Sequence, residues 1–308
     1  MILSASRRTD IPALYPDWLL TRLAAGEVLV PNPYNSKRVT RLLFSPQTVD
    51  CIVFWTKNAA PLLPRLPQLD ALGYGNYYFL FTLTPYDGKI ECALPPKAEI
   101  EQDFLRLGAQ IGASRLVWRY DPIFVDDFHT VEWHLTQFRR LCETLHPATS
   151  SCIISFLQPY RHIQKTFRAV TAAEAQAIAA SLAAIAAPFG IRLFTCAQEA
   201  DFSAYGIEHA ACIDKARIEA ITGYPLDIKA DSNQRPSCGC VQSVDMGVYD
   251  SCVNGCRYCY AVTRKAQAAR LYAAHDPNAP MLAGYPAADA IITEKSPPSH
   301  RIMQERLF

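Results

Sequence analysis

Three cysteines near the carboxyl-terminal end of the sequence have a type and spacing that could do chemistry. They are Cys252, Cys256 and Cys259, in the pattern C-x3-C-x2-C. Three thiolates can bind three irons of a 4Fe-4S cluster and leave the fourth iron free for a small chelating molecule. The alternative is a zinc site completed by Cys238, Cys240 or a histidine. Zinc ligand pairs are usually spaced C-x2-C, so the spacing favours the cluster.

Four further cysteines form a possible second metal site: Cys196, Cys212, Cys238 and Cys240. Four thiolates can hold a second iron-sulfur cluster or a zinc ion. For Cys196 and Cys212 the alternative is simple burial, because free cysteine is among the most buried residue types. His209 could replace one ligand. The chain has eleven cysteines, an odd number. In a reducing compartment, cysteines are expected to be free thiols or metal ligands rather than disulfides.

The elements that position these residues are alternating strands and helices, which predict an α/β fold with a parallel sheet. We expect strands over residues 2–6, 51–55, 77–83, 115–119, 151–156 and 192–196. Six strands at this spacing predict a partial (β/α)6 barrel similar to a TIM barrel. Polar residues follow nearly every strand, and the carboxyl ends of parallel strands build ligand sites. We therefore expect the active site at that edge.

The charged residues at the strand ends are candidates for binding and catalysis. Arg7 and Arg8 follow the first strand and could bind a carboxylate or phosphate. The alternative for them is an ion pair with Asp10 or Asp17. Catalytic contacts are assigned to three residues at later strand ends: Lys57, Arg119 and Asp121. The alternative for Asp121 is that it only orients Arg119. Three aromatic residues could stack on a nucleobase or fill the core: Trp55, Tyr78 and Trp118. For Tyr78 we favour a place in the core.

Helix signals surround the strands. Asp17 and Thr130 are expected caps, and Thr171 forms a capping box with Glu174. We expect helices over residues 17–26, 130–146, 171–188 and 259–274. After residue 213 the chain is polar and rich in cysteine, which predicts a loop organised by bound metal rather than by an apolar core. We expect a barrel over residues 1–230, completed by a cluster-binding segment over residues 231–308.

Charge and hydropathy limit the classes of function. The chain has thirty basic and twenty-nine acidic residues among 308, so its net charge is close to zero. This argues against nucleic acid as a partner, although a local basic groove is compatible with a neutral total. The first residues resemble neither a signal nor a transit peptide. We expect no apolar stretch of membrane-spanning length, since the run 172–187 is interrupted by Glu174, Gln176 and Ser181. The sequence predicts a cytoplasmic protein without membrane contact.

The cysteine triplet with its aromatic neighbours, GCRYCYA at 255–261, resembles the cluster loop of the radical SAM superfamily, towards the branch of spore photoproduct lyase. The resemblance implies that the open iron binds the amino and carboxylate groups of S-adenosylmethionine (SAM). It also implies reductive cleavage to a 5′-deoxyadenosyl radical, hydrogen abstraction from a substrate, and an electron donor such as flavodoxin or ferredoxin. Contacts to SAM or substrate are implied for Arg7, Arg8, Thr9, Asp10, Lys57, Thr82, Arg119 and Tyr258, the last beside the adenine.

In that superfamily the cluster loop follows the first barrel strand, whereas here it lies near the end of the sequence. A circular permutation reconciles the two, because termini of compact domains often lie close together. Four strand-end motifs occur in the order that relatives of spore photoproduct lyase show: 9–12, 56–57, 82–84 and 119–122. The chain also resembles an uncharacterised bacterial family with a radical-SAM-like cysteine cluster at its carboxyl end, through residues 4–13, 32–35, 54–58, 234–240 and 245–261.

The expected function is therefore that of a radical SAM enzyme acting on a small molecule. One alternative is a radical SAM enzyme that repairs or modifies nucleic acid, which predicts a basic groove. The other is a non-catalytic binding module stabilised by zinc, for which the polar strand ends would have no role.

Overall fold

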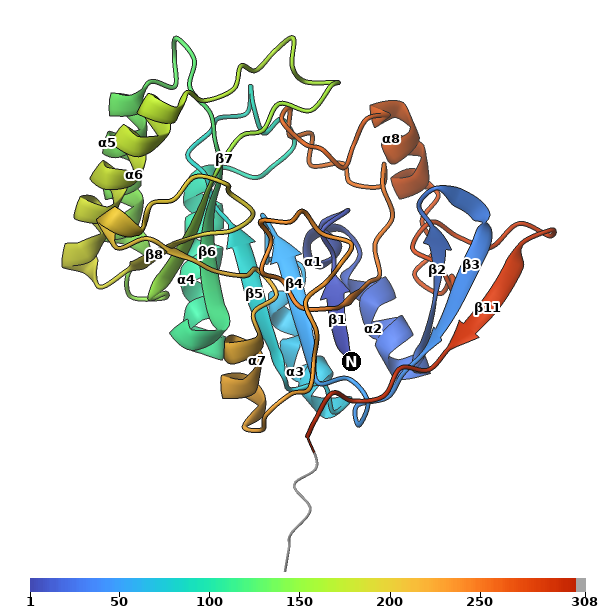
Figure 1. The fold of residues 1–308 in the computed structure, drawn as a ribbon. Helices are drawn as coiled ribbons and strands as arrows, with labels where there is room; N and C mark the ends of the chain where they lie inside the picture. The colour runs from blue at the N-terminus through green and yellow to red at the C-terminus, as the bar shows by residue number, and fades with distance from the viewer. Residues whose placement is uncertain (303–308) are drawn as a thin grey trace, which may run out of the picture.

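Eight parallel strands form the central sheet, in the order β10-β1-β4-β5-β6-β7-β8-β9 (Figure 1). The computed structural model describes residues 1–302. The strands are β1 (Ile2–Ala5), β4 (Cys51–Thr56), β5 (Tyr77–Thr82), β6 (Leu116–Ile123), β7 (Ser151–Phe156), β8 (Arg192–Thr195), β9 (Glu208–His209) and β10 (Val244–Asp245). Within the described residues the outer strands β9 and β10 do not pair with each other, so the sheet is open.

The α/β class and all six predicted strands are confirmed, but the number of strands is eight and the barrel does not close. The prediction missed β9 and β10 because each pairs through two residues. In β10, Val244 and Asp245 pair with Leu3 and Ser4 of β1. Two residues are too few to show the alternation of apolar and polar side chains by which strands are recognised.

Helices flank the sheet. They are α1 (Ile11–Leu14), α2 (Pro16–Ala25), α3 (Leu66–Ala71), α4 (Lys97–Ile111), α5 (Val131–Leu145), α6 (Ala172–Ala186), α7 (Lys215–Thr222) and α8 (Lys265–Ala273). The cap at Thr130 and the capping box at Thr171 are confirmed. The predicted cap at Asp17 is wrong, because the cap is Tyr15 and Asp17 instead binds Arg65 at 2.7 Å.

The predicted helix over 259–274 begins later than expected, at Lys265. The carboxylate of Asp250 accepts hydrogen bonds from the backbone N–H groups of Thr263 and Arg264, at 2.6 and 2.8 Å. These bonds hold the residues before the helix in a turn. The cysteine triplet is therefore outside α8.

A second, smaller sheet was not predicted. It contains β2 (Glu27–Asn32), β3 (Asn35–Leu43) and β11 (Ile291–Lys295), and it lies beside α2 and α8 (Figure 1). β2 and β3 are antiparallel, and β11 joins β3 in parallel. Pro31 and the charged residues of β3 hide the strand pattern, since proline and lysine are uncommon in strands.

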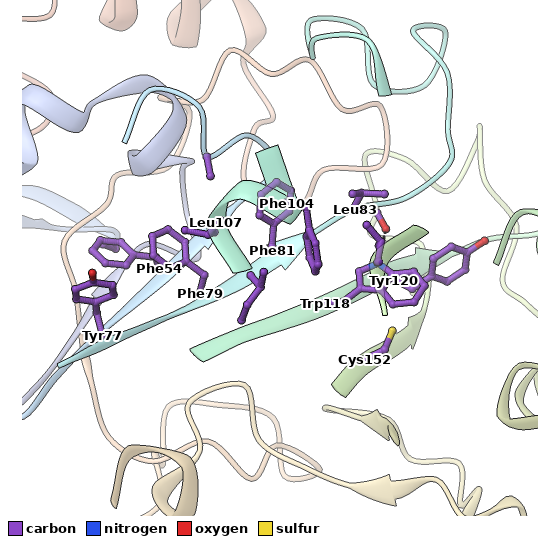
Figure 2. Close-up of a cluster of buried hydrophobic side chains, with 14 of the residues drawn as sticks. Phe54, Tyr77, Phe79, Phe81, Leu83, Phe104, Leu107, Trp118, Tyr120 and Cys152 are labelled. Carbon is purple, nitrogen blue, oxygen red and sulfur yellow. Dashed lines mark hydrogen bonds between the residues drawn. The ribbon is translucent and has the colours of Figure 1, made fainter. Parts of the chain in front are cut away.

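The two faces of the main sheet carry different side chains. Aromatic residues on one face pack against the helices, where Phe54 and Phe79 stack at 4.7 Å and Phe81 contacts Phe104 of α4 at 5.1 Å (Figure 2). The opposite face has its own buried cluster, which includes Val53, Leu80, Val117 and Ile153 of the strands and Ile218 of α7. Because side chains alternate along a strand, this second face continues to Trp55, Thr82 and Arg119 at the carboxyl ends.

One expectation about membranes needs correction. The helical stretch 172–189 is long and apolar enough to cross a bilayer by length and composition alone. Its apolar residues Ile178, Leu182 and Ile185 are buried in the core between the helix and the sheet. Packing against α5 and β8 thus accounts for its apolar character.

Gly108 of α4 allows close packing of that helix. A Cβ atom at this position would lie 2.5 Å from Cβ of Ala148 and 2.9 Å from its backbone. Gly108→Ala is therefore expected to lower the free energy of unfolding by about 1–3 kcal/mol, despite the better helix propensity of alanine. Urea denaturation measures the change. Gly88→Ala, which meets no atom within 4 Å, should leave the midpoint unchanged, and equal midpoints for both variants would contradict the packing argument.

Candidate functional site

A cavity of about 730 Å³ opens at the carboxyl ends of the parallel strands. Strand-end residues on its wall are Arg7, Arg8, Trp55, Lys57, Thr82, Arg119, Asp121 and Cys196. Both cysteine groups reach it, through Cys256 and Cys259 of the triplet and through all four cysteines of the second group. Most of the candidate residues therefore converge on one site.

β10 positions the triplet beside the first strand. The carboxylate of Asp245 accepts hydrogen bonds from the backbone N–H groups of Arg7 and Gly247, each at 2.9 Å, and from the Ser6 hydroxyl. The N–H of Met246 donates to the carbonyl of Ser4 at 3.0 Å. The chain then leaves the sheet directly into the cysteine loop.

The cysteine loop, residues 246–264, is held by contacts with distant parts of the chain. Tyr15 donates its hydroxyl to the Ser251 carbonyl at 2.5 Å, and the Asn254 amide donates to the Asp10 carboxylate at 3.0 Å. The backbone N–H of Arg257 donates to the carbonyl of Ile90 at 2.9 Å. These bonds fix the loop against α1 and the segment after β5.

The three thiols of the triplet are partly buried in this loop. Burial raises the pKa of the Cys252 thiol to about 12 and also raises the pKa values of Cys256 and Cys259. The sulfur of Cys259 accepts a hydrogen bond from the backbone N–H of Ala261 at 3.3 Å. Within residues 1–302, these sulfurs do not form a group whose members all lie within 4.8 Å. At least one pair of these sulfurs is therefore more than 4.8 Å apart.

Glu91 is the centre of a buried polar network beside the triplet. Its carboxylate accepts hydrogen bonds from Lys57 at 2.7 Å and from Thr84 at 2.8 Å, and also from Lys97 and the hydroxyl of Tyr258. The ammonium of Lys57 lies 5.4 Å from the ring centroid of Tyr258. Glu91 thereby fixes both Lys57 and Tyr258 at the cavity wall.

This network predicts a specific loss of stability in acid. Burial alone would raise the pKa of Glu91, but the ammonium groups of Lys57 and Lys97 outweigh it and lower the pKa to about 2, from 4.5. The ionised carboxylate therefore stabilises the fold above about pH 4.5, and this contribution is lost as the pH falls towards 2. Urea unfolding between pH 2 and 6 measures it. A free energy of unfolding that does not fall over this range would contradict the assignment.

Two arginines flank Trp55 inside the cavity. The guanidinium carbons of Arg7 and Arg119 lie 5.5 and 4.9 Å from its ring centroid. Arg119 pairs with Asp121, as the orienting role for that aspartate implied. Within the described chain, Nη2 of Arg7 and Nε of Arg119 are buried without a hydrogen-bond partner. Each is a donor available to an anion.

The predicted alternative partners of Arg7 and Arg8 are wrong. Nη1 of Arg7 lies 3.8 Å from Asp231, and Nη1 of Arg8 donates to the Gly247 carbonyl at 3.3 Å. The carboxylate of Asp10 instead caps α1 and accepts the backbone N–H of Lys57 at 2.8 Å. Burial raises the pKa of Asp10 to about 6.

Several predicted contact residues lie outside the cavity wall. Thr9 and Asp10 are buried beneath it, and Cys252 is not among its lining residues. Tyr78 is a core residue, as predicted, and its hydroxyl donates a hydrogen bond to the Cys212 carbonyl at 2.6 Å. Trp118 belongs to the opposite face of the sheet, where it stacks on Phe138 at 4.9 Å. Tyr258 does line the cavity.

The second cysteine group can hold a metal ion. The sulfurs of Cys196, Cys238 and Cys240 all lie within 4.8 Å of one another. Cys212 is buried in the same cluster as these cysteines, but its sulfur is not part of the group within 4.8 Å. His209 is not the replacement ligand that was considered, because its Nε2 bonds to the Ser237 carbonyl at 2.7 Å.

Some residues of the site were not predicted from the sequence. Glu91 and Lys97 follow no predicted strand, and Asp245 lies in a two-residue strand. Arg235 and Tyr260 also line the cavity, from the two cysteine loops. Proximity to the cysteine motifs was the available clue to these last two residues.

Comparison with known proteins gives a family but no activity. No curated protein matches the sequence. Among solved structures, a candidate alpha-L-fucosidase from Bacteroides thetaiotaomicron VPI-5482 is similar over 50% of this chain and 66% of that chain, at 11% identity and a TM-score of 0.28. A similarity this small carries no argument. Residues 2–261 match a family described as a domain of unknown function, DUF1848. Because the match covers most of its length, this chain belongs to the DUF1848 family.

Proposed function

We propose that the protein is a circularly permuted radical SAM enzyme that acts on a small molecule in the cavity. The pairing of β10 with β1 carries this proposal. β10 directly precedes the cysteine loop and lies next to the strand that leads to Asp10. The spatial order is thus strand, cluster loop, then the strands that end near Asp10, Lys57, Thr82 and Arg119. The radical SAM resemblance implies this order for an unpermuted chain.

The residues of the triplet suit a 4Fe-4S cluster. Each sulfur in such a cluster binds a different iron, so the ligands stand farther apart than around one ion. The C-x3-C-x2-C spacing of the triplet supports that assignment over a single zinc, whose ligand pairs are usually spaced C-x2-C. Hydrogen bonds to sulfur, such as that from Ala261 to Cys259, are among the features that set the potential of a cluster.

The other residues have roles that follow from their positions. When bound, the cluster and SAM supply one-electron cleavage and hydrogen abstraction. Arg7, Arg8 and Arg119 offer cationic groups for a carboxylate of SAM or substrate. Lys57 and Tyr258, both fixed by Glu91, form the wall next to Cys256. The partly enclosed cavity limits access of water to the reacting groups. A cytoplasmic location and a flavodoxin or ferredoxin donor stay predictions.

Anaerobic reconstitution tests the proposal. The full chain is reconstituted with iron and sulfide, reduced with dithionite and incubated with SAM. We expect formation of methionine and 5′-deoxyadenosine, and a change in the EPR spectrum of the reduced cluster when SAM is added. A reconstituted protein that binds no cluster, or whose reduced cluster neither changes its spectrum nor cleaves SAM, would refute it.

One observation favours the nucleic-acid alternative. Basic residues outnumber acidic ones on the cavity wall, with Arg7, Arg8, Lys57, Arg119 and Arg235 on the basic side. Such a surface can contact phosphates despite the neutral total charge. Salt-dependent binding of single-stranded or duplex DNA in a mobility-shift assay would support this alternative. Absence of binding at low salt would refute it.

A further inference from the structure

We infer that Cys196, Cys212, Cys238 and Cys240 form a tetrahedral site for one zinc ion, separate from the triplet, which holds the segment 230–241 in place as a wall of the cavity. The inference concerns the second cysteine group alone and does not depend on the proposed function.

The distances between the sulfurs favour a single ion. Around zinc, with Zn–S bonds of about 2.3 Å, the sulfurs of a tetrahedron are about 3.8 Å apart. Three of the four sulfurs here already lie within 4.8 Å of one another. A 4Fe-4S cluster would place one iron under each sulfur and spread them farther. The distances among these three sulfurs therefore suit a single ion.

The fourth ligand is Cys212. It follows β9, is 4% exposed and belongs to the same buried cluster as the other three cysteines. Its sulfur lies outside the group of three within 4.8 Å, so binding of the ion requires the Cys212 side chain to move towards that group. The Tyr78 hydroxyl fixes its backbone by donating to the Cys212 carbonyl at 2.6 Å. His209, the nearby histidine, is occupied by hydrogen bonds to Ser237 and Thr195. The donor set is thus four sulfurs, which zinc accepts readily in structural sites.

Backbone hydrogen bonds support the ligands. The N–H of Ile213 donates to the Cys240 sulfur at 3.3 Å, and the N–H of Val241 donates to the Ile213 carbonyl at 3.1 Å. The N–H of Asp231 donates to the Cys240 carbonyl at 2.9 Å. Donors of this kind orient metal ligands and stabilise their negative charge. They also join both ends of the 230–241 segment to the ligand residues.

The charges around the site are complementary. A zinc ion with four thiolates carries a net charge of −2, which needs compensation when it is buried. The guanidinium groups of Arg7 and Arg119 are close to the sulfurs: Arg7 to Cys240 and Cys212, and Arg119 to Cys212 and Cys196. Each arginine retains a buried donor nitrogen without a partner among the described residues. Because Arg7 also pairs with Asp231 and Arg119 with Asp121, the two guanidinium groups offset part of the charge of a tetrathiolate ion.

The site links three separate parts of the chain at the cavity. Cys196 follows β8, Cys212 follows β9, and Cys238 and Cys240 belong to the 230–241 segment. That segment contributes Asp231, Asn233, Gln234 and Arg235 to the cavity wall, yet its own buried apolar side chains are few. A bound ion replaces the missing core, because metal coordination supplies folding energy. Loss of the ion is expected to release this wall.

The experiment uses the full chain with Cys252, Cys256 and Cys259 replaced by alanine, so that a failed cluster assignment cannot affect it. We expect about one zinc per chain by elemental analysis, and four sulfur neighbours at about 2.3 Å by X-ray absorption. Exchange with cobalt should give thiolate-to-cobalt charge-transfer bands. Adding Cys238→Ser or Cys240→Ser should remove the zinc and speed proteolysis within 230–241, whereas Cys92→Ser should change neither.

Three results would overturn the inference. They are a metal-free triple variant that also takes up no cobalt, zinc retained after Cys238→Ser and Cys240→Ser, and an iron-sulfide chromophore in the triple variant after reconstitution. The last result would assign a second cluster to the four cysteines. Because Cys238 is partly exposed, its serine variant is the one least prone to misfold. Far-ultraviolet circular dichroism confirms that each variant is folded.

Discussion

Cys256→Ala is expected to eliminate the reductive cleavage of SAM by the reconstituted protein. Each sulfur of the triplet serves a different iron, so two remaining thiolates leave the cluster without enough ligands. Cys256 also lines the cavity, and the charges of Lys57 and Glu91 act on its thiol. We expect iron to fall by about four per chain, with no 5′-deoxyadenosine above the level without reductant.

Cys92→Ala provides a matched control for this variant. Cys92 is exposed, and its Cβ lies 3.2 Å from the position that a Cβ would occupy at Gly255 of the cysteine loop. It is therefore next to the triplet without belonging to it. The control should retain both iron and activity. SAM cleavage by Cys256→Ala at the rate of the unmodified protein would refute the cluster assignment, and loss of iron in Cys92→Ala would indicate a fourth protein ligand.

Glu91→Gln is expected to lower the free energy of unfolding by about 3–5 kcal/mol, the range for removal of one partner from a buried ion pair. The amide keeps hydrogen bonds to Thr84 and Tyr258 but leaves the ammonium groups of Lys57 and Lys97 without a countercharge. Both lysine side chains are mostly buried, at 14% and 22% exposed. Urea denaturation at pH 7 measures the loss. The variant should also lack the acid sensitivity that Glu91 confers.

Glu99→Gln is the control for the loss of one negative charge in the same region. Glu99 lies exposed in the first turn of α4, two residues after Lys97. Its substitution should change the free energy of unfolding by no more than about 0.5 kcal/mol. If the two variants were equally stable, the network around Glu91 would not be a source of stability.

The sequence predicts the strands well because each is a run of apolar residues ending in polar ones. That pattern also located the cavity, since Lys57, Thr82 and Arg119 follow strands of a parallel sheet. For the second cysteine group, the predicted approach of Cys196 to Cys238 and Cys240 is confirmed. The helix start at Lys265 was not predicted, because it depends on Asp250, whose carboxylate holds the preceding turn.

The contacts that complete the site depend on tertiary structure. Glu91 meets Tyr258 across 167 positions of sequence, and no local pattern marks such a pair. The same holds for β10, whose two residues pair with β1 although the two strands are about 240 positions apart in the sequence. The distances among the sulfurs of Cys196, Cys238 and Cys240, which all lie within 4.8 Å of one another, also need coordinates.

The late position of β10 has a consequence for synthesis on the ribosome. β1 emerges first, but the strand that covers its outer edge is not made until residues 244 and 245. Since domains fold from the N-terminus during translation, the growing sheet has a bare apolar edge for most of that time. Unpaired strand edges are templates for other chains. Translation products that stop before β10 are therefore expected to aggregate instead of persisting as shorter folded proteins.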